Sequence, residues 1–271
     1  MTTTLTGGVA VILYLVSSVL LGMRLARGSE GRQQSKTGPL GVGMGALVLH
    51  GLVLYQIVLT TSGINLGIFN SFSLVAWLIV FLLLVSSFSQ PTENLGILIL
   101  PLASVTVCLA LAFPTQRLID QNTPLSIEAH IFTSILAYSV LSIAAVQALL
   151  LAIQDRHLRN RHPGGFIRAL PPLQTMESLL FQMIRLGFVL LSVALLTGLL
   201  FLEDLFAQHL VHKTVLSIAS WGVFGTLLWG RHRFGWRGRI AIRWTLSGLA
   251  VLAIAYFGSK LVLELLLNLA S

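Results

Sequence analysis

Long apolar runs separated by short polar segments form the dominant pattern of this chain. Each run holds roughly 20 residues, which is the length that a helix needs to cross the hydrocarbon core of a bilayer. The pattern therefore predicts an all-α fold, a polytopic transmembrane helical bundle of about eight helices. The predicted helices cover residues 5–27, 40–60, 67–88, 95–113, 129–154, 178–202, 212–230 and 240–268.

The composition supports a membrane protein and sets its domain organisation. Hydrophobic residues make up 55% of the 271 positions and charged residues only 10%, which is too apolar for a soluble domain of this size. We expect a single integral membrane domain over 1–271, with four helices in 1–113 and four in 129–271. The opening MTTTLTGG carries no basic residue ahead of its apolar run, so a retained first helix is expected rather than a cleaved signal peptide.

Basic residues between the apolar runs predict the orientation in the membrane. Thirteen of the seventeen Lys and Arg residues fall into three clusters: Arg24, Arg27, Arg32 and Lys36; Arg156, Arg159, Arg161 and Arg168; and Arg231, Arg233, Arg237, Arg239 and Arg243. Such clusters are typical of cytoplasmic loops, and eight helices then place both termini outside. The net charge of +8 reflects these basic cytoplasmic loops, which are expected to lie beside the lipid headgroups. The dispersed charges, without an aromatic-interleaved basic surface, predict no nucleic acid partner.

The motifs of common enzyme classes are missing from the sequence. The one cysteine, Cys108, lies within the fourth apolar run, and the chain has no CxxC or CxxCH pattern for thiol chemistry or covalent heme attachment. Walker, GxSxG, HExxH and GxGxxG patterns are absent as well. We therefore predict that the protein is not an enzyme.

Histidines offer the remaining candidate chemistry. His130 begins the fifth predicted helix and His212 the seventh, so both are expected at the outer membrane boundary. Two neutral imidazoles that face each other can hold a heme iron from both sides, whereas the alternative is a pair of interfacial histidines bonded to headgroups. His130, Ser134 and Tyr138 follow at i, i+4 and i+8, which predicts one polar stripe on the helix, with Tyr138 as a further candidate cofactor-binding residue.

His50 is different because it lies near the middle of the second apolar run. At that depth an ionisable side chain is either a ligand or proton relay, or a packed structural residue bonded to a neighbouring helix. A second hypothesis for the whole protein follows from it. His50 together with Lys260 and Glu264 of the last helix could line a path for protons or divalent metal ions.

Four stretches of the sequence resemble the cytochrome c assembly family of membrane heme-handling proteins. They are 129–159, 170–201, 212–239 and the YFGSKL run at 256–261, and they resemble the eight-helix members without the family's tryptophan-rich periplasmic signature. His130 occupies the place of the heme-ligating histidine of that family. The resemblance implies a multi-pass protein of the bacterial inner membrane, with both termini periplasmic. Implied partners are the lipid bilayer, heme and membrane proteins of cytochrome biogenesis or metal efflux.

The chain departs from the family where better-known members carry the tryptophan-rich segment. It has only LVHKT there, with His212 close to the position of the signature's proline, and Trp229 stands in place of a later intramembrane histidine. The resemblance implies heme b held near the outer leaflet by His130 and His212. Lys213 and Arg117 would neutralise its propionates. The alternative is a membrane accessory or transporter for divalent metal ions or protons without heme.

Overall fold

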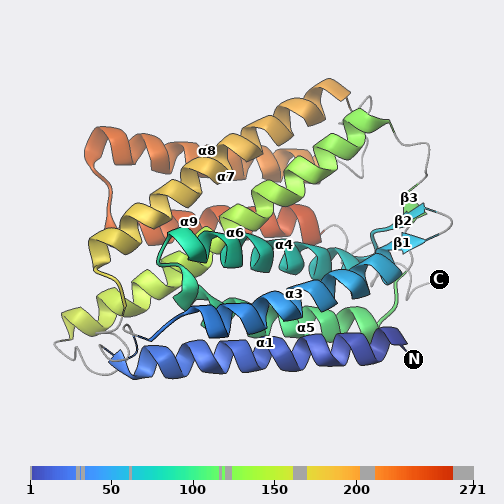
Figure 1. The fold of residues 1–271 in the computed structure, drawn as a ribbon. Coiled ribbons are helices and arrows are strands. Elements are labelled where there is room, and N and C mark those ends of the chain that lie inside the picture. The colour runs from blue at the N-terminus through green and yellow to red at the C-terminus, as the bar shows by residue number, and fades with distance from the viewer. Residues whose placement is uncertain are drawn as a thin grey trace. The chain divides into compact units, whose positions relative to one another are not determined.

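The helices predicted from the apolar runs are present in the computed structural model. The structure describes residues 2–28, 31, 34–60, 63–115, 118–119, 124–160, 170–201 and 211–258. In this part the elements follow in the order α1 (Thr2–Ala26), α3 (Thr37–Val58), β1 (Leu59–Thr60), β2 (Gly63–Asn65), α4 (Ile68–Ser89), the 3₁₀ turn η1 (Glu93–Leu95), α5 (Gly96–Ala112), β3 (Leu118–Ile119), α6 (Leu125–Arg159), α7 (Leu173–Phe201), α8 (Val211–Phe234), α9 (Gly238–Ala253) and a π-helical turn (Ile254–Gly258) (Figure 1). The prediction of an all-α polytopic helical bundle is confirmed.

Seven of the helical stretches in the described part are long and apolar enough to cross a membrane. The exception is α8, which coincides with the predicted helix at 212–230. Lys213 and several Ser, Thr and Gly residues lower the hydropathy of α8 below that of the other helices. The helix itself was therefore predicted correctly, although its composition is less apolar than that of a typical membrane span.

The chain divides into two compact units. Unit 1 contains residues 1–121 and 153–175, and unit 2 contains residues 122–152 and 176–271. Both α6 and α7 contribute residues to each unit. The first division between the units lies in the loop that separates the predicted halves 1–113 and 129–271, but 153–175 groups with the amino-terminal helices.

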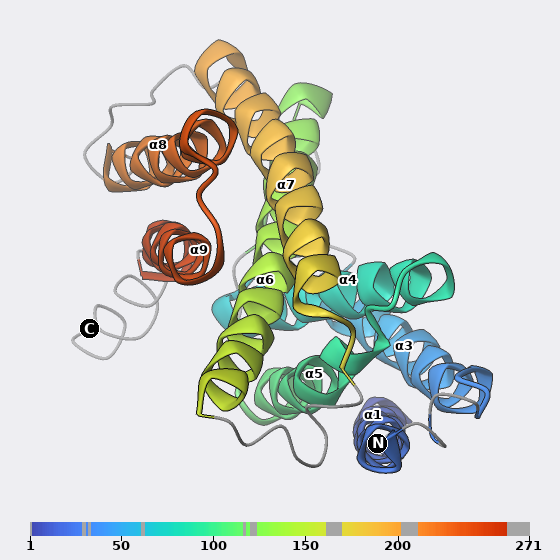
Figure 2. The ribbon, with the colours of Figure 1, turned by 90° about the vertical axis from the view of Figure 1, so that its left-hand side faces the viewer.

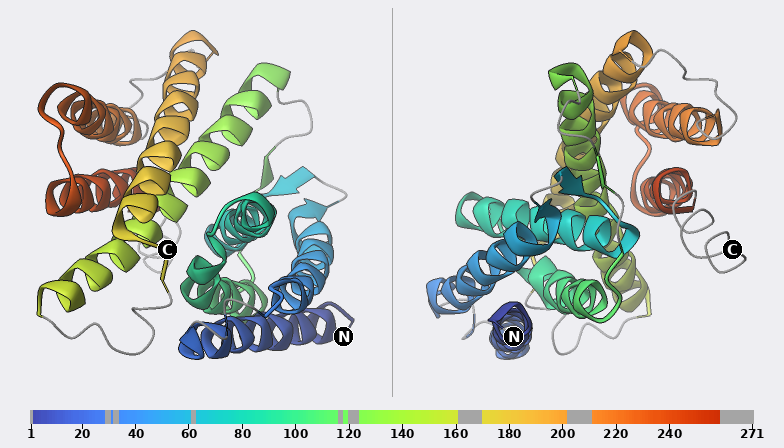
Figure 3. Two further views of the ribbon diagram at one scale, coloured as in Figure 1. Left: turned by 60° about the vertical axis from the view of Figure 1, so that its left-hand side comes forward. Right: turned by 90° about the vertical axis from the view of Figure 1, so that its right-hand side faces the viewer.

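In unit 1, α1 lies against both α3 and α5, and α4 packs on the same two helices (Figure 3). Small residues permit this close approach. Gly43 of α3 faces Ser17 of α1, where an added Cβ would lie 3.0 Å from the serine Oγ. Gly7 of α1 packs in the same way on Leu111 of α5. The contacts fix how α1 sits between its two neighbours.

A proline within α5 leaves one backbone carbonyl of that helix without its usual donor. Pro101 has no N–H to give to the carbonyl of Ile97, four residues earlier. The Ser18 hydroxyl of α1 donates a hydrogen bond of 3.0 Å to this oxygen instead. Because water is absent from the bilayer core, such a replacement donor lets the helix continue through the proline.

A small antiparallel sheet ties together loops at one end of unit 1. Its strand order is β1-β2-β3, with Leu59 opposite Ile64 and Ile64 opposite Ile119. The Asn65 amide donates to the Thr115 carbonyl at 3.0 Å, next to the sheet. The apolar pattern did not predict these strands, because they are only two or three residues long.

In unit 2, close contacts join α7 to α6 and α8, and α8 to α9. Gly187 of α7 packs on Leu141 of α6. The Trp221 Nε1 of α8 donates to Ser192 of α7 at 2.9 Å, and Ser220 donates to the Gly248 carbonyl of α9 at the same distance. Figure 2 shows α8 and α9 side by side as a helical hairpin.

One face of α7 has the exposed apolar surface expected of a membrane helix. The exposed residues recur at spacings of three and four, which places them on a single helix face. They are Leu186, Val189, Val193, Leu196 and Leu200. Lipid contact explains this stripe, because the same side chains would be unfavourable in water.

Candidate functional site

His130 lies on α6 in unit 2 and is half-buried against α7. Its Nδ1 atom is 3.2 Å from the Oγ1 of Thr197. Gly198, the next residue of α7, is in close contact with the imidazole. A Cβ at this position would be 3.0 Å from the histidine Cε1. Thr197 therefore holds the ring through its Nδ1 atom, and Gly198 packs against its Cε1 atom. Only a residue without a side chain at 198 leaves the ring this much room.

The hydrogen bonds of Thr197 determine which nitrogen of His130 carries the proton. A threonine hydroxyl has one hydrogen, and that hydrogen points to the backbone carbonyls of Val193 and Ala194, at 2.9 and 3.0 Å. Toward His130 the Thr197 oxygen can therefore only accept, so the Nδ1 of the imidazole donates. The neutral ring then has its lone pair on Nε2. A metal-binding histidine has this same arrangement, with one nitrogen donating to a neighbour and the other facing the metal.

Two of the other predicted heme-site residues, His212 and Lys213, lie on α8. His212 is exposed in the first turn of α8, and no hydrogen bond or ring contact joins it to His130 among the described residues. Lys213 follows it and is part-buried. Arg117 lies outside the residues that the structure describes, as do Lys260 and Glu264.

Tyr138 takes part in an aromatic cluster within unit 2. Two turns after His130 on α6, its ring packs against Tyr256 and Phe257, with centroid distances of 5.9 and 5.4 Å. Tyr256 and Phe257 belong to the π-helical turn after α9. The cluster holds the end of α9 against α6, next to the polar stripe that begins at His130.

His50 is fully buried in unit 1 and both of its ring nitrogens are hydrogen-bonded. Its Nδ1 lies 3.2 Å from the hydroxyl of Tyr14 on α1, and its Nε2 lies 2.8 Å from the hydroxyl of Ser73 on α4. Since both hydroxyls can donate or accept, either neutral tautomer satisfies all three groups. The site joins three helices, and neither nitrogen has a free lone pair directed at a metal.

The sequence analysis missed a buried carboxylate at one end of unit 1. Glu93 of η1 pairs with Arg24 of α1 at 3.3 Å and with Lys36 at 3.7 Å. Only 11% of the glutamate side chain is exposed. A signal existed in the sequence. Glu93 is an isolated acidic residue between two apolar runs, and it is expected on the same side of the membrane as the basic cluster of residues 24–36. Such an acid is expected to pair with the cations around it.

Unit 2 contains a similar group, formed by Glu177 of α7 and two arginines from the α8–α9 region. Arg231 donates to the Glu177 carboxylate at 2.7 Å, and the Nε of Arg237 lies 4.0 Å away. The Arg231 guanidinium also sits 4.6 Å from the centre of the Phe181 ring. These contacts clamp the end of α8 onto α7.

Comparison with known proteins identifies the family. The family model described as Cytochrome C assembly protein matches residues 41–267. The chain belongs to the cytochrome c assembly family. Inner membrane protein YpjD of Escherichia coli strain K12 is 35% identical over 227 residues, which cover 82% of this chain and 84% of YpjD. The predicted family and the prediction of a multi-pass membrane protein are both confirmed.

Two further relatives match smaller shares of this chain. Cytochrome c biogenesis protein CcsA of Chlamydomonas reinhardtii is 25% identical over 212 residues, which cover 73% of this chain and 58% of that protein. An uncharacterized 28.8 kDa protein of Azospirillum brasilense is 36% identical over 144 residues, or 52% of this chain and 53% of that protein. No solved structure matches the chain.

Proposed function

We propose that this protein binds heme b in the membrane and handles it without catalysing a reaction. The observation that carries the proposal is the placement of His130, whose Nδ1 is hydrogen-bonded to Thr197 and whose Nε2 has no hydrogen bond to a described side chain. Neutral imidazole is the usual ligand of b-type heme iron. A half-buried ring whose orientation is fixed loses less entropy on ligation than a mobile one.

His212 is the proposed second axial ligand, and cations nearby complete the site. Lys213 directly follows His212 in the sequence, and Arg117 is the proposed partner for a second propionate. Gly198, flat against His130, would leave a shallow surface beside the ligand for a planar macrocycle. When bound, heme would supply an iron centre, which His130 and His212 would hold.

The proposal places the heme near the outer leaflet of a bacterial inner membrane, with both termini on the periplasmic side. It counts α8 as an eighth span, so that the three basic clusters lie together in the cytoplasm. The name of YpjD as an inner membrane protein supports the choice of membrane. His130 and His212, at the starts of α6 and α8, then lie at the opposite, outer side.

Membrane proteins of cytochrome biogenesis are the proposed partners. The name of the CcsA relative supports this class. No three His, Cys, Asp or Glu side chains gather into a possible metal site within the described part of the chain. Lys260 and Glu264, named for the alternative of divalent metal ion or proton transport, lie outside the described part.

Visible absorption spectroscopy of the full chain purified in mild detergent tests the proposal. We expect a b-type spectrum, with sharp bands after reduction, and its loss in both His130→Ala and His212→Ala. His232→Ala is the matched control, because His232 is an exposed histidine on the same helix as His212. Absence of any heme spectrum, even after hemin is added to the wild-type protein, would refute the proposal.

A further inference from the structure

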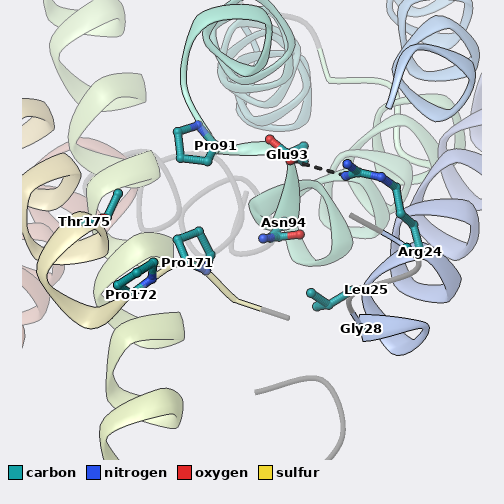
Figure 4. Close-up of a pocket in the computed structure, with 10 residues that line it drawn as sticks. Arg24, Leu25, Gly28, Pro91, Glu93, Asn94, Pro171, Pro172 and Thr175 are labelled. Atoms are coloured by element: carbon teal, nitrogen blue, oxygen red, sulfur yellow. Dashed lines mark hydrogen bonds and ion pairs between the residues drawn. The ribbon is translucent and has the colours of Figure 1, made fainter. Parts of the chain in front are cut away.

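A cavity of about 390 Å³ opens at the end of unit 1 that contains Glu93. Its volume lies within the range of small-ligand sites. Its apolar lining residues include Leu25, Pro91 and Pro171. Arg24, Glu93 and Asn94 form the polar wall, as Figure 4 shows. All the residues that line this cavity belong to unit 1.

The polar wall has hydrogen-bond donors that the described residues do not use. Arg24 donates through Nε to the Gln34 carbonyl and through Nη1 to Glu93, which leaves its Nη2 without a partner in the described part of unit 1. The Asn94 side chain, which points into the cavity in Figure 4, likewise forms no hydrogen bond to a described residue. Unused donors on a cavity wall call for an acceptor.

The charges of the site favour an anion as that acceptor. Arg24 and Lys36 contribute two positive charges, and Glu93 compensates one of them. Glu93 also holds the Arg24 guanidinium in place, because both side chains are largely buried. Lys36 pairs with Glu93 from outside the cavity lining, so the described group of Arg24, Glu93 and Lys36 carries one positive charge in excess. Arginine with an adjacent amide is a common arrangement for binding phosphate oxygens.

We propose that this cavity binds a phosphate group whose organic part rests on the proline-lined wall. The volume is much larger than one phosphate needs, so a phosphate ester fits better than the bare ion. Anionic phospholipid headgroups gather near basic loops of membrane proteins, and soluble phosphate esters have the same chemistry. The proposal is independent of heme, because the cavity lies in unit 1 and His130 in unit 2.

Asn94→Asp is the variant that tests the site. It keeps the size of the side chain, replaces an amide donor by a negative charge and leaves the Arg24–Glu93 pair intact. Gln174→Glu is the matched control, since it adds one negative charge on an exposed residue beside the lining residue Thr175 but outside the cavity wall. Thr175→Trp is a second test, because a large side chain at this exposed lining position would fill the cavity.

Two binding measurements on the full chain distinguish the sources of the phosphate. The first is calorimetric titration of inorganic phosphate into protein in phosphatidylcholine nanodiscs. The second is native mass spectrometry of protein released from nanodiscs of phosphatidylcholine and phosphatidylglycerol, which counts retained phosphatidylglycerol. We expect binding in one of them. Asn94→Asp and Thr175→Trp should weaken it about tenfold or more, and Gln174→Glu should leave it unchanged.

The outcomes separate cleanly. Phosphate binding in the first measurement identifies a soluble phosphate ester as the ligand class, and retention of phosphatidylglycerol alone identifies a lipid headgroup. Binding that is equal in wild type and Asn94→Asp would overturn the proposal, as would the absence of binding in both measurements. Size-exclusion chromatography shows whether each variant is folded. If Asn94→Asp aggregates, Thr175→Trp decides the question alone.

Discussion

His50 in unit 1 and His130 in unit 2 are both membrane histidines, but their hydrogen bonding differs. His50 is fully buried, and hydroxyls of Tyr14 and Ser73 occupy both of its nitrogens. His130 is half-buried, and its Nδ1 is hydrogen-bonded to the Thr197 hydroxyl. Both histidines join helices, but no described side chain is hydrogen-bonded to the Nε2 of His130.

The difference shows that depth in an apolar run does not by itself mark a functional histidine. A polar side chain in a membrane must be satisfied, and a packed helix partner can satisfy it completely. His50 lies deeper in its apolar run than His130, yet its hydrogen bonds leave it no lone pair for a ligand. The hydrogen bonding of each ring nitrogen, and not its position along the helix, is therefore the basis of the proposed heme site.

The largest expected effect on stability is at His50. In His50→Leu the hydroxyls of Tyr14 and Ser73 stay buried without their partner, so we expect a loss of about 2 kcal/mol. That corresponds to a fall of roughly 5 °C in the midpoint of thermal denaturation in detergent. His232→Leu, at an exposed position, should not shift the midpoint.

A combined variant sharpens the interpretation of His50. Removing all three polar groups, as Tyr14→Phe, His50→Leu and Ser73→Ala, leaves no unsatisfied donor or acceptor at the site. We expect this triple variant to recover much of the stability lost in His50→Leu. A triple variant that is less stable than His50→Leu would show that the hydroxyls have other roles.

The next effect is expected at Thr197, in heme binding. Thr197→Val has nearly the same shape but no oxygen to accept from Nδ1 of His130, so the ring loses its fixed tautomer. We expect heme affinity to fall about tenfold, the lower end for loss of a partner behind a metal ligand. Hemin titration followed in the Soret band measures it. Thr197→Ser keeps the oxygen and should retain wild-type affinity, and equal affinity of all three proteins would exclude a role for Thr197.

A smaller effect is expected at Ser18, another polar contact of unit 1. Ser18→Ala leaves the Ile97 carbonyl without a donor opposite Pro101, at a cost of about 1 kcal/mol. The same change in a Pro101→Ala background should cost much less, since the alanine N–H can donate to Ile97. Thermal denaturation of the four proteins gives this coupling. If the two effects simply add, Ser18 does not compensate for the proline.

The positions of the helices could be predicted from the sequence because apolar length decides them in a membrane protein. Runs of about 20 apolar residues have no alternative to a helix in lipid. The strands β1 to β3 could not be predicted, because two or three residues have no periodicity. The grouping of 153–175 with unit 1 could not be predicted either, because it depends on tertiary contacts.

The candidate site was partly accessible from the sequence. His130 was singled out by its place at the start of a helix, but its partners Thr197 and Gly198 are about 70 residues away and become adjacent only in the fold. The same limit concealed the contact of Glu93 with Arg24. Residue type and spacing predict which groups are able to act, whereas the hydrogen bonds that leave them free or occupied come from packing.

The most direct test of the contrast between the two histidines is the amount of heme bound per polypeptide in His50→Gln and His130→Gln. Glutamine can replace hydrogen bonds of histidine but is a poor iron ligand, so the pair separates packing from ligation. Pyridine hemochrome measurement on the two purified variants and the wild type gives the ratio. We expect His50→Gln to retain heme close to the wild-type level and His130→Gln to lose nearly all of it. Heme that survives in His130→Gln but is lost in His50→Gln would contradict the account.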